Sequence, residues 1–90
     1  MGSNVFLPKV GDVVVFGEPY SSYGCISLSS REDDPLTDRV LFDTANTVFL
    51  VVDSLPIRDT CARFKLLAST RHVCYAALYV EGDNFFKKVA

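Results

Sequence analysis

The chain has no tryptophan and a single histidine, His72, and its cysteines are few and scattered. Cys25, Cys61 and Cys74 are odd in number and widely spaced, with no Cys-x-x-Cys pair, which argues against a disulfide framework and against a cysteine-based zinc site. We therefore expect reduced thiols that are buried as small apolar side chains. The glycines are spaced as punctuation between strands and form no phosphate-binding loop. No signature of catalysis emerges, and no cofactor is implied.

The chain also lacks an excess of basic residues and any long apolar run. Its formal net charge is −2 and only Lys87 and Lys88 are adjacent, so it has no basic stripe of the kind that binds nucleic acid non-specifically. No apolar run approaches the roughly 18 residues of a membrane-spanning helix. The start, MGSNVFLPK, has neither the charged beginning nor the apolar centre of a signal peptide. We expect a soluble cytoplasmic protein that binds neither membrane nor nucleic acid.

Apolar residues, by contrast, are abundant, at 49% of 90 residues. A domain this small has much surface for its volume, so the surplus must form an exposed patch or be covered by another subunit. Val, Phe, Tyr, Ile and Thr lie in short segments between turn-forming residues, which predicts one all-β domain over residues 1–90. The expected strands are 13–16, 25–29, 39–42, 47–53, 62–69, 72–80 and 85–89, with the turn at Gly11 and Asp12 leading into the first and the turn at Thr70 and Arg71 joining a hairpin.

The segment NTVFLVV, residues 46–52, holds five apolar residues in a row, from Val48 to Val52. A strand with one wet face alternates polar and apolar residues, so an unbroken apolar run indicates a central strand that is covered on both faces. Either Val48, Leu50 and Val52 or Phe49 and Val51 point into the core. The other series then has to be covered by a neighbouring segment or by a partner.

Several segments resemble the SH3-like small β-barrels, in particular those encoded by bacteriophages. KVGDVVVF (9–16) is similar to the opening strand of that fold, and TVFLVVDSLP, RFKLLAS, LYV and DNFFKKV are similar to the rest, over all but the extreme N-terminus. The resemblance implies an SH3-like barrel of about six short, mostly antiparallel strands. It also implies a short turn at Asp83 to Phe85, followed by a last strand that pairs back with the first.

Two groups of side chains have an alternative chemical interpretation. His72 and Cys74 are two residues apart on an expected strand, which is how a nucleophile pair or half of a zinc site begins, but no orienting acid or further ligand pair accompanies them. Residues 30–38 carry Glu32, Asp33, Asp34 and Asp38, without the alternation and central glycine of a calcium loop. We expect a strand-end histidine beside a buried thiol, an exposed acidic loop, and no metal.

Exposed aromatic and apolar side chains are the best candidates for contacts with a partner. If Tyr20 and Tyr23 lie on the long loop after the first strand, they can form a recognition platform with Tyr75 or Tyr79; otherwise they close the end of the barrel as part of the core. Phe85 and Phe86 are adjacent on a strand, so one ring points outward. The predicted partner contacts are Tyr20, Tyr23, Phe49, Val51, Tyr75, Tyr79 and Phe86.

These features predict a non-enzymatic structural or protein-interaction module that associates with another protein or with itself as a homo-oligomer. The resemblance implies a bacteriophage accessory, connector or cement protein, located in the host cytoplasm or the virion. One alternative is a nucleic-acid-binding module that uses aromatic stacking, with basic residues at Arg39, Arg63, Arg71, Lys87 and Lys88. Another is a small inhibitor of a host protein, with the acidic loop at the rim of its contact surface.

Overall fold

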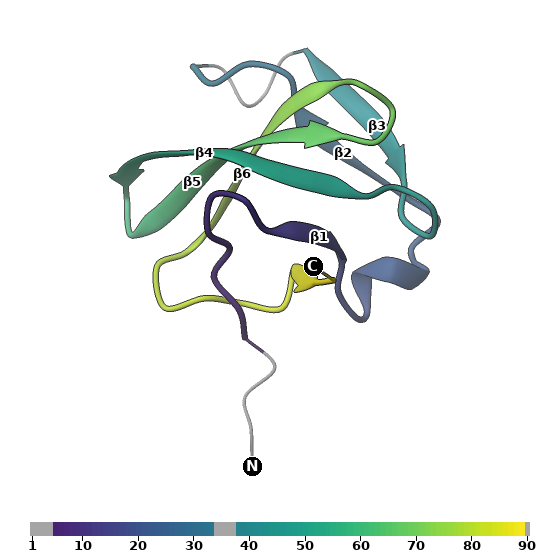
Figure 1. Ribbon diagram of the computed structural model, residues 1–90, viewed down its shortest axis with the longest axis horizontal. Helices are drawn as coiled ribbons and strands as arrows, with labels where there is room; N and C mark the ends of the chain where they lie inside the picture. The colour runs from purple at the N-terminus through teal and green to yellow at the C-terminus, as the bar shows by residue number, and fades with distance from the viewer. Residues whose placement is uncertain (1–4, 34–37, 90) are drawn as a thin grey trace.

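The protein is an all-β structure with a single antiparallel sheet, seen in a computed structural model that describes residues 5–33 and 38–89 (Figure 1). The strand order in the described part of the chain is β3-β2-β6-β5-β4-β1-β7. The strands span Val13–Phe16 (β1), Cys25–Ser29 (β2), Arg39–Asp43 (β3), Phe49–Arg58 (β4), Cys61–Ala68 (β5), Val73–Tyr79 (β6) and Phe86–Lys88 (β7), and one 3-10 turn, η1, spans Tyr20–Ser22. No helix in these residues is long and apolar enough to cross a membrane.

The strand positions follow the predicted pattern closely, and two predicted pairings are present. β5 and β6 form the expected hairpin, with Leu67 opposite Val73 and the Arg71 N–H donating to the Ala68 carbonyl. β1 pairs with β7, so the first and last strands lie side by side, with Phe16 opposite Phe86. Gly11 has φ +97°, in the left-handed region that glycine tolerates, and the Asp12 N–H donates to the Lys9 carbonyl to close the predicted turn.

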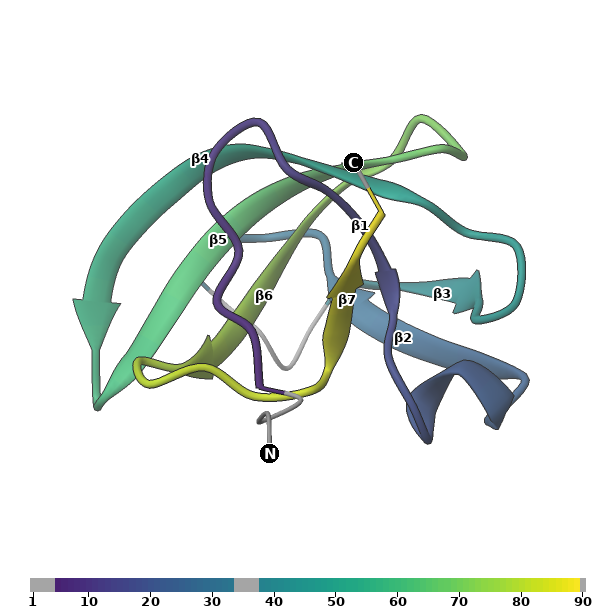
Figure 2. The same ribbon diagram turned by 60° about the horizontal axis from the view of Figure 1, so that its bottom comes forward.

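The sheet curls around one core but does not close into the predicted barrel of about six strands (Figure 2). The described residues form seven strands, and among them the outer strands β3 and β7 do not pair with each other. The β2–β3 hairpin extends the sheet beyond β6 instead, and it carries Phe42 into the core against Phe49, with ring centroids 5.1 Å apart. Phe16 and Phe86 of the opposite end stack at 5.7 Å, so both ends of the sheet contribute rings to one core.

β4 runs further than predicted and continues through Pro56. The pairing of β4 with β5 shifts register twice, between Val51 and Asp53 and between Leu55 and Arg58. Pro56 lies within the second shift, so the backbone N–H that proline lacks is not needed for the ladder there. The strand then turns at Asp59 and Thr60, whose φ values of +52° and +61° are those of a tight two-residue hairpin turn. The predicted end at residue 53 is therefore wrong.

The burial of β4 shows which of the two predicted apolar series points into the core. Phe49 and Val51 are 0% and 1% exposed and lie in the core, whereas Val48, Leu50 and Val52 are on the outer face and each more than a third exposed. Beyond Val52, β5 is the only strand of the described residues that pairs with β4, because β1 pairs with β4 at Phe49 and Leu50 and the turn before β1 bonds to Val51.

Candidate functional site

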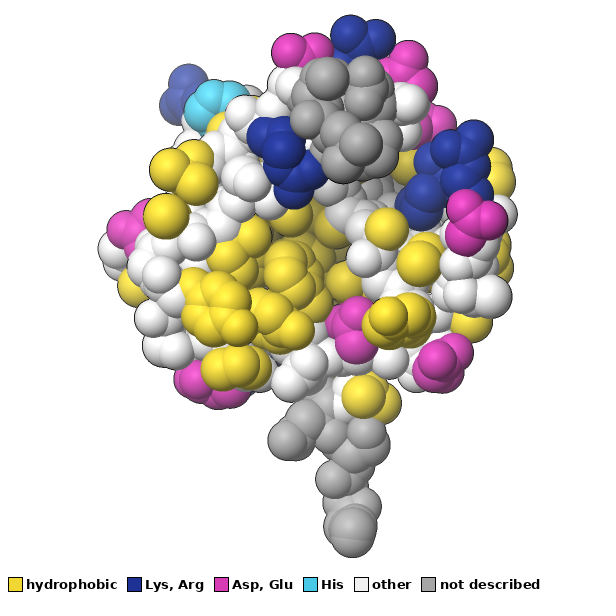
Figure 3. Space-filling model, turned by 180° about the vertical axis from the view of Figure 1, so that it is seen from behind, with side chains coloured by type: hydrophobic (Ala, Val, Ile, Leu, Met, Phe, Trp, Pro, Cys, Tyr) yellow, Lys and Arg dark blue, Asp and Glu magenta, His cyan; other side chains and the backbone are white. Residues whose placement is uncertain are grey.

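An open hollow of about 410 Å³ lies between β6, η1 and the segment before β7. Figure 3 shows the face behind the view of Figure 1, where hydrophobic side chains gather in a depression with basic side chains near its rim. We name this hollow the aromatic groove. It is lined by Tyr20, Leu28, Ser29, Arg39, Tyr75, Ala76, Ala77, Leu78, Tyr79, Asp83, Asn84 and Phe85. Its volume is within the range of ligand-binding pockets in proteins.

The groove exists because the sheet splits between β2 and β6. These two strands pair at a single position, Ser29 opposite Tyr75, whereas β6 pairs with β5 along its whole length. Arg39 from β3 reaches over β2, where its Nη2 donates to the Ser27 carbonyl at 2.8 Å and its Nε to the Ser27 hydroxyl at 3.0 Å. As a result, the groove is lined by two core residues that a continuous sheet would have covered, Leu28 and Leu78.

The aromatic wall of the groove is fixed by ring packing that reaches the core. Tyr20 lies in η1 with its ring centroid 5.0 Å from that of Phe85 and 5.4 Å from that of Tyr23. Phe85 contacts the buried Phe16 edge to face at 5.5 Å. A rigid aromatic wall of this kind offers contact area at a low cost in conformational entropy.

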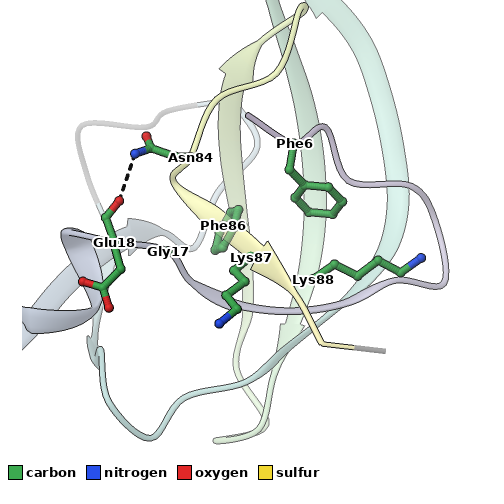
Figure 4. A pocket seen from close by; sticks show the side chains of 7 residues that line it. All are labelled: Phe6, Gly17, Glu18, Asn84, Phe86, Lys87 and Lys88. Atoms are coloured by element: carbon green, nitrogen blue, oxygen red, sulfur yellow. Dashed lines mark hydrogen bonds between the residues drawn. The ribbon is translucent and has the colours of Figure 1, made fainter. Parts of the chain in front are cut away.

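A polar clasp at Asn84 separates the aromatic groove from a second hollow. The Asn84 Nδ2 donates to the Glu18 carbonyl at 2.9 Å, as the dashed line in Figure 4 shows. The second hollow has a volume of about 400 Å³ and lies between the Phe6 and Phe86 rings, with Lys87 and Lys88 from β7 at its border. Its Lys88 ammonium lies 3.5 Å from the Asp12 carboxylate. Fewer aromatic side chains line this hollow, so the aromatic groove is the stronger candidate.

The structure brings three of the predicted contact residues together and removes three others from the surface. Tyr20, Tyr75 and Tyr79 line the aromatic groove, and Tyr23 is exposed beside Tyr20. Tyr20 is half-buried, so it belongs to the platform and to the edge of the core at once. The prediction is wrong for the residues that lie in the core, which are Phe49, Val51 and Phe86.

The wrong prediction for Phe86 and the groove residues that were not predicted both have structural explanations. β7 begins at Phe86, and that residue faces Phe16 across the β1–β7 ladder, which turns its ring inward and leaves Phe85 half-buried in the groove wall. The adjacency of Phe85 and Phe86 predicted that one of the two rings points outward, but not which one. Leu28 and Ala77 were not predicted as site residues, because nothing in the sequence indicates that β2 diverges from β6. Arg39 was named only as a basic residue of the nucleic-acid-binding alternative.

A second apolar surface crosses the outer face of the sheet. Leu50 lies opposite Val13 on β1 and Leu67 on β5, and Leu67 lies opposite Val73 on β6. The row continues past β7 because the Val89 N–H donates to the Val13 carbonyl at 2.8 Å. We name these five residues the outer row; Leu50, Leu67, Val73 and Val89 are between 39% and 52% exposed. Val48 and Val52 flank the row along β4.

The cysteines and His72 differ in their exposure to solvent. Cys25 is exposed, Cys61 is half-buried and Cys74 is buried, so the expectation of buried thiols is correct for Cys74 and wrong for Cys25. Burial raises the pKa of the Cys74 thiol to about 12, which keeps it protonated. His72 is exposed before β6, and its Nδ1 lies 2.9 Å from the Thr70 hydroxyl.

The acidic loop is exposed where it is described. Arg31 pairs with Asp33 at 3.2 Å and with Asp38 at 3.4 Å, and the guanidinium lowers the pKa of Asp33. Asp34, which belongs to the same prediction, lies outside the described residues. Among residues 5–33 and 38–89, no three acidic, histidine or cysteine side chains are grouped as metal ligands.

Compared with models of protein families, with curated proteins and with solved structures, the chain gives no significant match. The surfaces described above are therefore the features from which a function can be inferred.

Proposed function

We propose that the protein is a non-enzymatic protein-interaction module that binds a segment of a partner protein in the aromatic groove. The observation that carries this proposal is one open hollow of about 410 Å³ whose lining includes Tyr20, Tyr75 and Tyr79. Tyrosine combines a large apolar ring with a polar tip, and buried tyrosines are among the residues that contribute most to binding energy at protein interfaces.

The strand order supports placing the module among the SH3-like folds. In the order β6-β5-β4-β1-β7, the consecutive strands β4, β5 and β6 form a meander. β4 also pairs with the N-terminal strand β1, and β1 pairs with the C-terminal strand β7. In this proposal the β2–β3 hairpin is an elaboration of the long loop after β1. The role as a bacteriophage accessory, connector or cement protein stays a prediction from the sequence resemblance.

The test is selection of binding peptides from a phage-displayed library of random twelve-residue peptides. We expect enriched peptides whose affinity falls at least tenfold for the double variant Tyr75→Ala and Tyr79→Ala. The matched control is Ile57→Ala, because Ile57 is 67% exposed on β4 and does not line the groove. Failure to enrich any peptide, or equal binding to the double variant, would contradict the proposal.

A second candidate function, self-association through the outer row, is favoured by the continuity of that row over β6, β5, β4, β1 and the residue after β7. A contiguous apolar surface on a small protein is a common site of association between subunits. The two functions use different surfaces and do not exclude each other.

A further inference from the structure

The β6 strand has backbone groups at the groove that no described segment pairs with. The Ala68 N–H donates to the His72 carbonyl at 2.8 Å and the Val80 N–H to the Thr60 carbonyl at 3.1 Å. Because the direction alternates along an antiparallel ladder, the even-numbered residues of this strand direct their backbone groups toward β5. Tyr75, Ala77 and Tyr79 direct theirs toward the opposite edge, where the groove lies.

Only part of that edge is occupied. Tyr75 pairs with Ser29 of β2, and the Tyr79 carbonyl accepts a hydrogen bond from the Gly82 N–H at 2.8 Å. In the ladder set by Ser29 and Tyr75, the residue opposite Ala77 would be Ser27, but the Ser27 carbonyl accepts from Arg39 instead. Within the described chain, this leaves the N–H and carbonyl of Ala77 and the N–H of Tyr79 at an open strand edge, which is a template for another strand.

Hollows lie on both faces of this edge. The aromatic groove lies on the core side, where Leu28, Leu78 and Phe85 line it. On the outer face, Leu55, Cys61, Arg63, Tyr75 and Ala77 contribute to another hollow of about 230 Å³, which we name the outer hollow. Successive side chains of a strand point to opposite faces, so a strand paired with Ala77 would place alternate side chains in the two hollows.

We propose that the groove binds its partner as an added β-strand, an extended segment of another protein that pairs through its main chain with Ala77 and Tyr79. This inference rests on the proposed function and specifies how the partner is held. The distance from Tyr75 to Tyr79 along a strand is roughly 13 Å, which matches four or five extended residues. Main-chain bonds supply affinity in this mode and the pockets for alternate side chains supply selectivity.

The two hollows define the chemistry of the segment. Every second residue is apolar, because Tyr20, Leu78 and Phe85 line the groove. The intervening residues are neutral or acidic, because the outer hollow holds Arg31, Arg58 and Arg63 against Glu32 and Asp59. A single extended segment fits better than the edge of a second folded copy, because the groove is recessed between η1, β2 and residues 83–85.

The first test is the sequence pattern of peptides selected from the random twelve-residue library. Strand addition predicts apolar residues at every second position over four or five residues. A proline-rich consensus, or apolar residues spaced three and four apart, would overturn strand addition while leaving the groove as the binding site. Binding that is insensitive to the Tyr75→Ala and Tyr79→Ala double variant would overturn both.

The second test removes single main-chain donors from a selected peptide by N-methylation. Only alternate peptide N–H groups face β6, so methylation at every second position should weaken binding at least tenfold, while the positions between should change it less than threefold. Equal sensitivity at all positions, or at none, would overturn strand addition. This test alters only the peptide, so the fold of the protein is unaffected.

The third test removes the donor on the protein. Ala77→Pro deletes an N–H that faces the groove and not β5, so the ladder with β5 keeps its bonds. We expect at least a tenfold loss of peptide affinity with an unchanged circular dichroism spectrum. The matched control is Leu41→Pro, which should keep wild-type affinity, because Leu41 lies on the outer strand β3 with its N–H directed away from β2 and lines neither hollow. Unchanged affinity in Ala77→Pro would overturn the inference. A dimer that Ala77→Pro converts to monomer would also overturn it, since a second copy would then occupy the edge.

Discussion

The Asn84 side-chain amide donates a hydrogen bond to the carbonyl oxygen of Glu18, 66 residues earlier in the chain. Next to this contact, Gly17 approaches the same segment so closely that a Cβ on residue 17 would lie 2.3 Å from the Asn84 carbonyl oxygen. The Gly17 N–H also donates to the Phe85 carbonyl at 2.9 Å. These contacts hold η1 against the residues before β7 and so fix the relative positions of Tyr20 and Phe85 in the groove.

Gly17→Ala is therefore expected to destabilise the protein by about 2 kcal/mol, because the added methyl group meets backbone that cannot rotate away. Urea unfolding followed by circular dichroism measures the change. The control is an alanine at an exposed turn residue nearby, Ser22→Ala, whose hydroxyl donates to the Pro19 carbonyl within the same turn. A Gly17→Ala variant as stable as wild type would show that this approach is not tightly constrained.

The hairpin between β4 and β5 stores strain that substitution can relieve. Thr60 has φ +61°, which a β-branched residue adopts at a cost that glycine does not incur. We expect Thr60→Gly to raise the free energy of unfolding by about 1 kcal/mol. The comparison is Thr70→Gly in the next hairpin, which has no such strain to relieve and should lower stability. If the two glycines have the same effect, strain at residue 60 is not the cause.

Stability should depend on the ionisation of Cys74 at alkaline pH. Burial raises the pKa of this thiol from 9.0 to about 12, so its protonated form is favoured in the fold. The contribution is fully present below the unfolded-state pKa near 9 and is lost as the pH rises toward the folded-state value. Between pH 9 and pH 11, wild type should lose stability more steeply than Cys74→Ala, by up to about 1.4 kcal/mol per pH unit.

The control for that measurement is Cys25→Ala, because Cys25 is exposed and its removal should leave the slope of wild type unchanged. The remaining ionisable side chains are common to all three proteins, so they do not affect the comparison. Identical slopes for wild type and Cys74→Ala would refute the assignment.

The outer row should control self-association. We expect wild type to form dimers or larger species at high concentration and the double variant Leu50→Lys and Leu67→Lys to be monomeric. The reason is that two positive charges facing each other on neighbouring strands prevent burial of the row. Light scattering across a concentration series measures the mass. Leu41→Lys is the matched control, since Leu41 is 66% exposed but lies on β3, away from the row. A monomeric wild type at all concentrations would contradict self-association.

The sequence alone determined the all-β class and the approximate place of every strand. Short apolar segments rich in Val, Phe and Tyr alternate with turns that contain Gly, Pro and Asp. Strand propensity and the alternation of side chains depend only on residues close together in the chain, so the sequence is enough to predict them. Tyr20, Tyr75 and Tyr79 could be chosen as contacts for the same reason, since aromatic residues on strands and loops of a small domain lie in the core or at its rim.

Only the tertiary structure decided which face of β4 is buried, which ring of the Phe85–Phe86 pair turns inward, and that the sheet stays open between β2 and β6. Each depends on a register between segments far apart in the chain, and a shift of one residue reverses every side chain of a strand. The aromatic groove is a product of that long-range geometry, because it lies where one hairpin leaves the ladder and exposes the edge of β6 at Ala77.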